Sequence, residues 1–188
     1  MNPEFEENRY KLIDLNLGFE DLMIKSFEEC LRVNNVQPKP VIGIEKSSDV
    51  FPFPLDVGME NLTSIVHRDY TTPIIEKHID LKLIPTYCYT RKYFKGSMMR
   101  LHKDRDACEI SLTYCLSGPE WEINMGENTL ITKKGKAVIY RGSEVKHGRL
   151  RPSSGEVIQV FNHWVILDGT KSKSAYDDGK FKSFYMGC

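Results

Sequence analysis

Two histidines and one aspartate have the residue types and the spacing needed to bind a metal ion. His102 and Asp104 are two positions apart in the run His102-Lys103-Asp104. On an extended chain, side chains two residues apart leave the same face, so both can point at one ion. His147 follows much later, at what we expect to be a strand end, and can fold back to meet them. Two imidazoles and one carboxylate would then occupy one face of the ion and leave its other coordination positions open.

This set of donors suits ferrous iron. Non-haem Fe(II) oxygenases bind iron through two histidines and one carboxylate, and the open positions take further ligands. A bare H-x-D pattern occurs by chance in many chains, but its surroundings here are more specific. Tyr93-x-x-Gly96 precedes it at a fixed spacing, and an alternating strand at 108–116 follows it. A strand at 137–140 then leads toward His147.

In this order the motifs resemble those of the 2-oxoglutarate- and Fe(II)-dependent oxygenases, on the prolyl-4-hydroxylase-like branch. The segment 102–113, together with His147-Gly148-Arg149 and segment 159–164, is also similar to a bacterial and phage subgroup of that branch. The resemblance covers about residues 83–166. It implies that His102, Asp104 and His147 bind Fe(II), with 2-oxoglutarate as co-substrate and dioxygen as oxidant. It also implies a double-stranded β-helix, which is a jelly-roll, cupin-like barrel.

The resemblance leaves open which basic residue holds the distal carboxylate of 2-oxoglutarate. In most relatives this residue lies about ten positions after the second histidine, but positions 156–157 here are Glu and Val. We expect Arg149 to replace it, because it lies two residues after His147 and shares its face on an extended chain. Its planar guanidinium can make two charge-assisted bonds to a carboxylate. Arg105 and Arg151 remain alternatives.

Other side chains are candidates for contacts around this site. Tyr93 matches the family tyrosine that hydrogen-bonds the co-substrate. Ser111 and Gln159 could also contact the co-substrate, although either could satisfy a buried polar group instead. We expect His163 to lie in the core or behind a metal ligand, and Trp121 to belong to the core.

Composition narrows the class of protein. The chain has 188 residues, of which 40% are hydrophobic and 28% charged, which is typical of a single globular domain. Its formal net charge is +0, so we expect no general attraction to nucleic acid or to an anionic membrane. The five cysteines form no C-x-x-C pair, and the first residues do not look like a signal peptide. We therefore expect a cytoplasmic protein, where reducing conditions also keep iron ferrous. Nothing in the sequence indicates an oligomeric state.

The hydrophobic pattern predicts helices first and strands afterwards. We expect one domain that is mainly β, with a mostly helical support at 1–82, the barrel core at 83–166 and a tail at 167–188. Helices should flank the barrel on one side. His67 and His78 should lie on solvated helix surfaces. The proline-rich loop at 35–58 and the tail could cover the site. The individual elements expected are an edge strand at 10–15, helices at 19–34, 59–67 and 72–80, and strands at 84–95, 108–116, 121–125, 129–132, 137–140, 148–151 and 156–165.

The resemblance implies an enzyme that couples decarboxylation of 2-oxoglutarate to hydroxylation of a substrate. A prolyl or other peptide residue is the first expectation for that substrate, and a free small molecule is the second. Two other functions stay open. One is a cupin-type metalloenzyme that does not use 2-oxoglutarate, and the other is a non-catalytic barrel that serves as a binding module.

Overall fold

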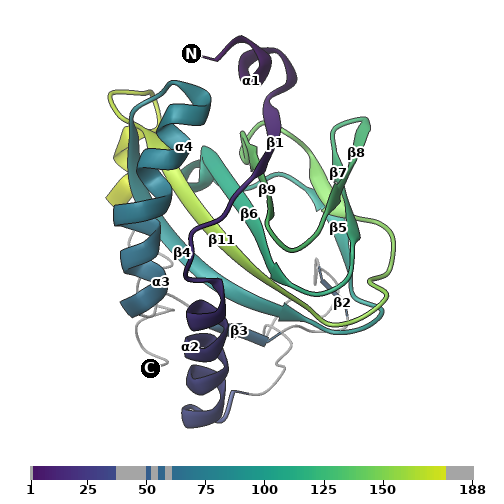
Figure 1. The fold of residues 1–188 in the computed structure, drawn as a ribbon. Coiled ribbons are helices and arrows are strands. Elements are labelled where there is room, and N and C mark those ends of the chain that lie inside the picture. Colours follow the sequence, from purple (N-terminus) through teal and green to yellow (C-terminus); the bar gives the residue numbers. More distant parts are fainter. Residues whose placement is uncertain (1, 37–49, 52–54, 58–60, 177–188) are drawn as a thin grey trace.

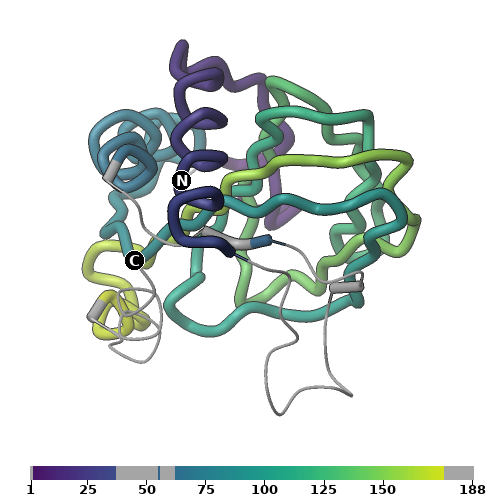
Figure 2. The backbone as a smooth tube through the Cα atoms, turned by 90° about the horizontal axis from the view of Figure 1, so that it is seen from below, coloured from purple at the N-terminus to yellow at the C-terminus, as the bar shows by residue number. Residues whose placement is uncertain are grey.

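The computed structural model describes residues 2–36, 50–51, 55–57 and 61–176. Within these ranges the chain forms two antiparallel sheets that face each other, with helices on the outer side of the larger sheet (Figure 1). The view from below shows the helices gathered on one side of the strands (Figure 2). This is the jelly-roll architecture predicted from the sequence.

The six strands of the larger sheet run in the order β1-β9-β6-β11-β4-β3. Their bounds are β1 Tyr10–Asp14, β9 Lys136–Tyr140, β6 Ile110–Ser117, β11 Val157–Ile166, β4 Leu83–Tyr93 and β3 Leu55–Val57. The smaller sheet has the order β2-β5-β10-β7-β8. Its strands are β2 Val50–Phe51, β5 Met98–His102, β10 His147–Arg149, β7 Trp121–Met125 and β8 Asn128–Thr132.

Alternation along the central strands gives the larger sheet two different faces. On β6, Leu112 and Tyr114 pack outward into the main apolar core. Cys115, one position later, belongs to a separate cluster inside the barrel. Seven of the eight residues of β6 are buried, because helices cover one face and the smaller sheet covers the other. The same alternation on β11 points Gln159, Phe161 and His163 into the barrel.

The outer face of the larger sheet is covered by α1 Pro3–Asn8, α2 Glu20–Val33, α3 Asn61–Ile65, the π-helix η1 Val66–Thr71 and α4 Thr72–Ile79. On α2, Met23 and Phe27 supply the buried side chains, whereas Leu22 and Val33, which belong to the same apolar pattern, are exposed. The predicted strand at 10–15 is confirmed as β1, an edge strand paired with β9. Two short 3-10 helices, η2 Asp106–Cys108 and η3 Ser172–Tyr176, complete the described elements.

The prediction of two separate helices around residues 59–80 was wrong, and so was the solvated position of His67. The chain runs without a break from α3 through η1 into α4. Pro73 has no N–H to donate, and just before it the Thr72 backbone N–H and hydroxyl both donate to the His67 carbonyl. His67 is only 2% exposed, and its ring contacts Trp164 edge-on. His78 on α4 is half-buried.

Some elements were not predicted, and some predicted segments lie outside the residues that the structure describes. The pattern does not predict α1 or β5, and the expected loop at 35–58 contains β2 and β3. Residues 37–49, 52–54, 58–60 and 177–188 lie outside the described residues, and so does most of the predicted cover over the site. Among the described helices, none is long and apolar enough to cross a lipid bilayer.

Candidate active site

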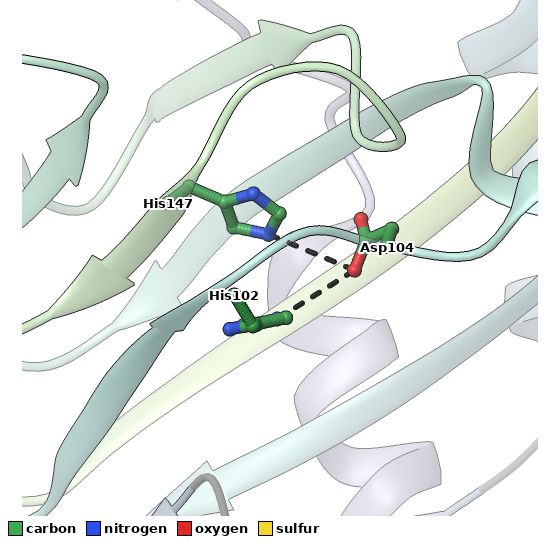
Figure 3. A group of neighbouring side chains, drawn as sticks. All are labelled: His102, Asp104 and His147. Carbon is green, nitrogen blue, oxygen red and sulfur yellow. Dashed lines mark ion pairs between the residues drawn. The ribbon is translucent and has the colours of Figure 1, made fainter.

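The three predicted metal ligands meet at one end of the smaller sheet. His102 is the last residue of β5 and His147 is the first residue of β10, and these two residues are directly paired across the antiparallel strands. Their rings lie 4.5 Å apart between centroids. Asp104 follows β5, and its backbone N–H donates to the Gly142 carbonyl at 2.8 Å. The carboxylate thereby faces both imidazoles (Figure 3).

The distances among these three side chains leave space for an ion. One carboxylate oxygen of Asp104, Oδ1, lies 3.6 Å from His102 Nε2 and 3.7 Å from His147 Nε2. These separations are longer than hydrogen bonds. The three donor atoms nevertheless all lie within 4.8 Å of one another. A divalent cation between them would bring one oxygen and two nitrogens into its coordination sphere.

Backbone contacts fix the orientation of both imidazoles. His102 Nδ1 lies 2.9 Å from the Arg100 carbonyl, and His147 Nδ1 lies 2.9 Å from the Val145 carbonyl. A carbonyl oxygen only accepts, so each Nδ1 carries the proton and donates. Each Nε2 therefore offers its lone pair toward Asp104 when the imidazole is neutral.

The electrostatics keep Asp104 and His147 in the forms that could bind a metal ion. Burial raises the pKa of Asp104, but the facing imidazoles of His102, His147 and His163 outweigh it and hold that pKa well below its usual value. Burial lowers the pKa of His147, although the Asp104 carboxylate partly opposes this. At neutral pH the site thus has an ionised carboxylate and a neutral His147, which are the ligating forms.

Arg149 lies wholly inside the barrel, two residues after His147, as the strand spacing predicts. It is 0% exposed. Its Nη1 donates to the carbonyls of Trp121 and Glu122 and to the Thr132 hydroxyl, and its Nη2 donates to Gln159 Oε1 at 3.0 Å. All of these acceptors are neutral, and no carboxylate in the described part of the chain pairs with it. Burial lowers the pKa of Arg149 to about 10, so it is still a cation at neutral pH.

Two further candidates from the sequence lie next to Arg149. Tyr93 is 0% exposed and meets the Trp121 ring edge-on at 5.0 Å. The Tyr93 hydroxyl has no hydrogen-bond partner among the residues that the structure describes. Gln159 accepts from both Arg149 and Thr113. Trp121 is buried, as expected, and its ring lies 4.3 Å from the Arg149 guanidinium carbon.

The two alternative arginines lie elsewhere. Arg151 has a side chain that is 75% exposed, and it pairs with Glu122 at 3.1 Å. Arg105 is half-buried next to the candidate metal ligand Asp104, with its guanidinium 4.9 Å above the Tyr87 ring. Of the three arginines weighed from the sequence, Arg149 is the one enclosed by the barrel.

Ser111 and His163 lie beside Asp104. The Ser111 hydroxyl lies 3.2 Å from Asp104 Oδ2 and 2.9 Å from His163 Nδ1, so the structure places it against a predicted metal ligand. Sequence reasoning missed Tyr140, whose buried ring contacts the His147 ring at 4.5 Å. Burial and the nearby Asp104 carboxylate raise the pKa of Tyr140 well above its usual value. Tyr140 lies at an inward position of β9, a signal that alternation could have supplied.

No model of a known protein family matches the sequence, and no curated protein matches it either. Solved structures do resemble it. A prolyl-4-hydroxylase from Pseudomonas putida superposes with a TM-score of 0.65 at 14% identity, covering 86% of this chain and 94% of that one. A prolyl hydroxylase from Trichoplax adhaerens, in complex with a hypoxia inducible factor peptide fragment, gives 0.63 at 11% identity, with coverage of 90% and 88%.

HygX from Streptomyces hygroscopicus, with nickel, 2-oxoglutarate and hygromycin B bound, gives a TM-score of 0.62 at 11% identity, covering 91% of this chain and 90% of that one. Identities this low establish likeness of fold alone. The similar structures include prolyl hydroxylases, which is the branch of the superfamily that the sequence motifs also resemble. This chain has the jelly-roll fold of the 2-oxoglutarate- and Fe(II)-dependent oxygenases, and its structural neighbours include prolyl-4-hydroxylases.

Proposed function

We propose that this protein is a 2-oxoglutarate- and Fe(II)-dependent oxygenase that hydroxylates its substrate. The fold supports the general class. The observation that carries the proposal is the buried cation of Arg149, in the same barrel as the three candidate metal ligands. A buried charge without a counter-ion is costly, so its retention indicates a ligand that supplies the negative charge.

The unused edge of the Arg149 guanidinium has the shape of a carboxylate site. Nη1 is fully engaged by acceptors of β7 and β8, and one hydrogen of Nη2 points to Gln159. Arg149 Nε has no hydrogen-bond partner among the described residues. Nε–H and one Nη2–H form one edge of the guanidinium plane, which is the edge that binds a carboxylate through two parallel bonds. The nearby Tyr93 hydroxyl offers one more donor.

In this proposal, one set of residues binds the metal and another binds the co-substrate. His102, Asp104 and His147 would hold Fe(II) through one face, leaving positions for the keto-acid end of 2-oxoglutarate and for dioxygen. Arg149, with Tyr93 beside it, would hold the distal carboxylate. Bound iron and 2-oxoglutarate supply the oxidising chemistry, while the chain orients both and excludes water from the barrel.

For the substrate we propose a peptide residue, with proline as the first choice and a free small molecule as the second. Several of the similar structures are prolyl hydroxylases, and one is bound to a peptide. Inside the barrel, the rings of Tyr89 and Phe161 stack at 4.7 Å and 12°. Tyr89 is half-buried, so this aromatic surface could pack against an apolar side chain. The hygromycin-bound neighbour supports the small-molecule alternative.

Release of succinate from 2-oxoglutarate tests the class of enzyme. Purified protein is incubated in air with Fe(II) and 2-oxoglutarate, with and without proline-containing peptides, and succinate is measured. We expect succinate that depends on iron and disappears in His102→Ala and Asp104→Ala, while their circular dichroism remains that of the wild type. Metal binding without any use of 2-oxoglutarate would indicate a cupin-type metalloenzyme instead. Binding of neither would leave a non-catalytic module.

A further inference from the structure

We propose that Ser111 and His163 are positioning residues that lock the carboxylate of Asp104 so that only one of its oxygens faces the metal. This inference rests on the proposed function, because it concerns the same site. Ser111 lies on β6 and His163 on β11, and the two residues are direct partners across these neighbouring strands. Ser111 is 0% exposed and His163 is 3% exposed.

The hydrogen bonds in this group have a definite direction. An ionised carboxylate only accepts, so the Ser111 hydroxyl must be the donor to Asp104 Oδ2 at 3.2 Å. The Cys108 carbonyl lies at 3.3 Å from the same hydroxyl, but the charged oxygen is the stronger acceptor. The Ser111 oxygen can then accept from His163 Nδ1–H at 2.9 Å. The chain of donors runs from His163 through Ser111 to Asp104.

This arrangement separates the roles of the two carboxylate oxygens. Oδ2 is held by Ser111, while Oδ1 faces the Nε2 atoms of His102 and His147. A carboxylate free to rotate could bind a metal through both oxygens. It would then fill one of the positions that the proposed function needs for the co-substrate or dioxygen. Holding Oδ2 keeps Asp104 a one-oxygen ligand.

The backbone of Gly142 packs closely against the Oδ2 side of the carboxylate. A Cβ added at Gly142 would lie only 2.5 Å from Asp104 Oδ2, from the Ser111 Oγ and from the Cys108 carbonyl oxygen. Glycine therefore lets the backbone approach the carboxylate closely. On the other side, the His163 ring packs on Tyr87 at 4.5 Å between centroids. Gly142 thus packs against the Asp104 carboxylate, and Tyr87 packs against the His163 ring.

A different interpretation of these side chains is a second metal site. Donor atoms of Asp104, Cys108 and His163 also lie within 4.8 Å of one another. However, His163 Nδ1 contacts Ser111, and Cys108 Sγ lies 3.0 Å from the Tyr87 hydroxyl. These contacts favour support of Asp104 over a second ion. The number of metal ions bound per chain distinguishes the two interpretations.

The test measures metal binding without turnover. Metal-free full-length protein is titrated with Mn(II), and bound ion is followed by electron paramagnetic resonance for Ser111→Ala and His163→Leu. We expect Mn(II) affinity to fall about 10- to 100-fold in each, with an altered spectrum of the bound ion. His163→Asn should restore most of the affinity, because its amide N–H can replace Nδ1–H. Ser111→Thr keeps the hydroxyl and should also bind nearly as the wild type.

The matched control is Thr86→Val. It removes another buried hydroxyl, which donates to the Ala107 carbonyl at 2.8 Å, and it should leave Mn(II) affinity unchanged. Wild-type Mn(II) affinity in folded Ser111→Ala and His163→Leu would overturn the inference. So would two ions bound per chain, or a loss in Cys108→Ser equal to that in Ser111→Ala. If Ser111→Ala does not fold, the contrast between His163→Leu and His163→Asn decides the question. A protein that binds Mn(II) in this way but releases no succinate would refute the proposed function and leave the positioning role standing.

Discussion

Replacing Arg149 with methionine should abolish tight binding of 2-oxoglutarate while leaving metal binding intact. Methionine has a similar length and fills the same space inside the barrel, but it has neither the charge nor the donors. In the metal-free protein two effects oppose each other. The buried cation disappears, while the neutral acceptors that Arg149 satisfies lose their donor. The dissociation constant of the keto acid is therefore a better readout than thermal stability.

The magnitude follows from the open edge of the guanidinium. We expect two charge-assisted hydrogen bonds to the distal carboxylate, each contributing about 1.5–3 kcal/mol. Losing both costs about 3–6 kcal/mol, and about 1.4 kcal/mol corresponds to a factor of ten. The dissociation constant of 2-oxoglutarate should therefore rise about 100- to 20,000-fold in Arg149→Met. Arg149→Lys keeps the charge but loses the fork, so an increase of about 10- to 100-fold is expected.

The assay is calorimetric titration of Mn(II)-loaded protein with 2-oxoglutarate in the absence of oxygen. Arg151→Met is the matched control, because Arg151 is two residues further along the chain and its side chain is 75% exposed. It should bind the keto acid as the wild type does. Arg105→Met tests the remaining alternative. Unchanged affinity in Arg149→Met, together with a large loss in Arg105→Met, would refute the reasoning from the buried cation.

Three further predictions concern single side chains. Tyr93→Phe removes a hydroxyl without a partner among the described residues, so it should not lower stability, while the dissociation constant of 2-oxoglutarate measured by calorimetry rises about fivefold. Gly142→Ala should destabilise the protein by about 1–3 kcal/mol in urea unfolding and should also weaken Mn(II) binding, because the new Cβ would overlap Asp104. Unchanged stability together with unchanged Mn(II) affinity would contradict the close packing. Burial lowers the pKa of His67 from 6.5 to about 3. Between these two pH values the unfolded chain binds a proton at His67 that the folded chain does not. The free energy of unfolding therefore falls as the pH falls, by roughly 1.4 kcal/mol per pH unit. His67→Phe should reduce this slope in urea unfolding of the metal-free protein between pH 7 and 5, and an identical slope would refute the assignment.

Several features of this protein follow from short-range sequence patterns. The two-residue spacing of His102 and Asp104 at a strand end places both side chains on one side of β5, and the same spacing directs His147 and Arg149 to one side of β10. Alternation along 108–116 and 156–165 predicts the two central strands of the larger sheet. These inferences succeed because side-chain direction along a strand depends only on the local backbone. The binding roles of these residues stay predictions.

Other features depend on which strands become neighbours, and only the tertiary structure decides that. Ser111 and His163 meet beside Asp104 because β6 and β11 pair in one register, which shifts between Ile158 and Gln159. The sequence does not encode that register in any local period. The burial of His67 depends in the same way on the π-helical turn before Pro73. Sequence alone thus determined which residue types could bind a metal and a keto acid, whereas the pairing of distant strands decided which side chains surround and hold them, because contacts between strands depend on the packing of the whole barrel.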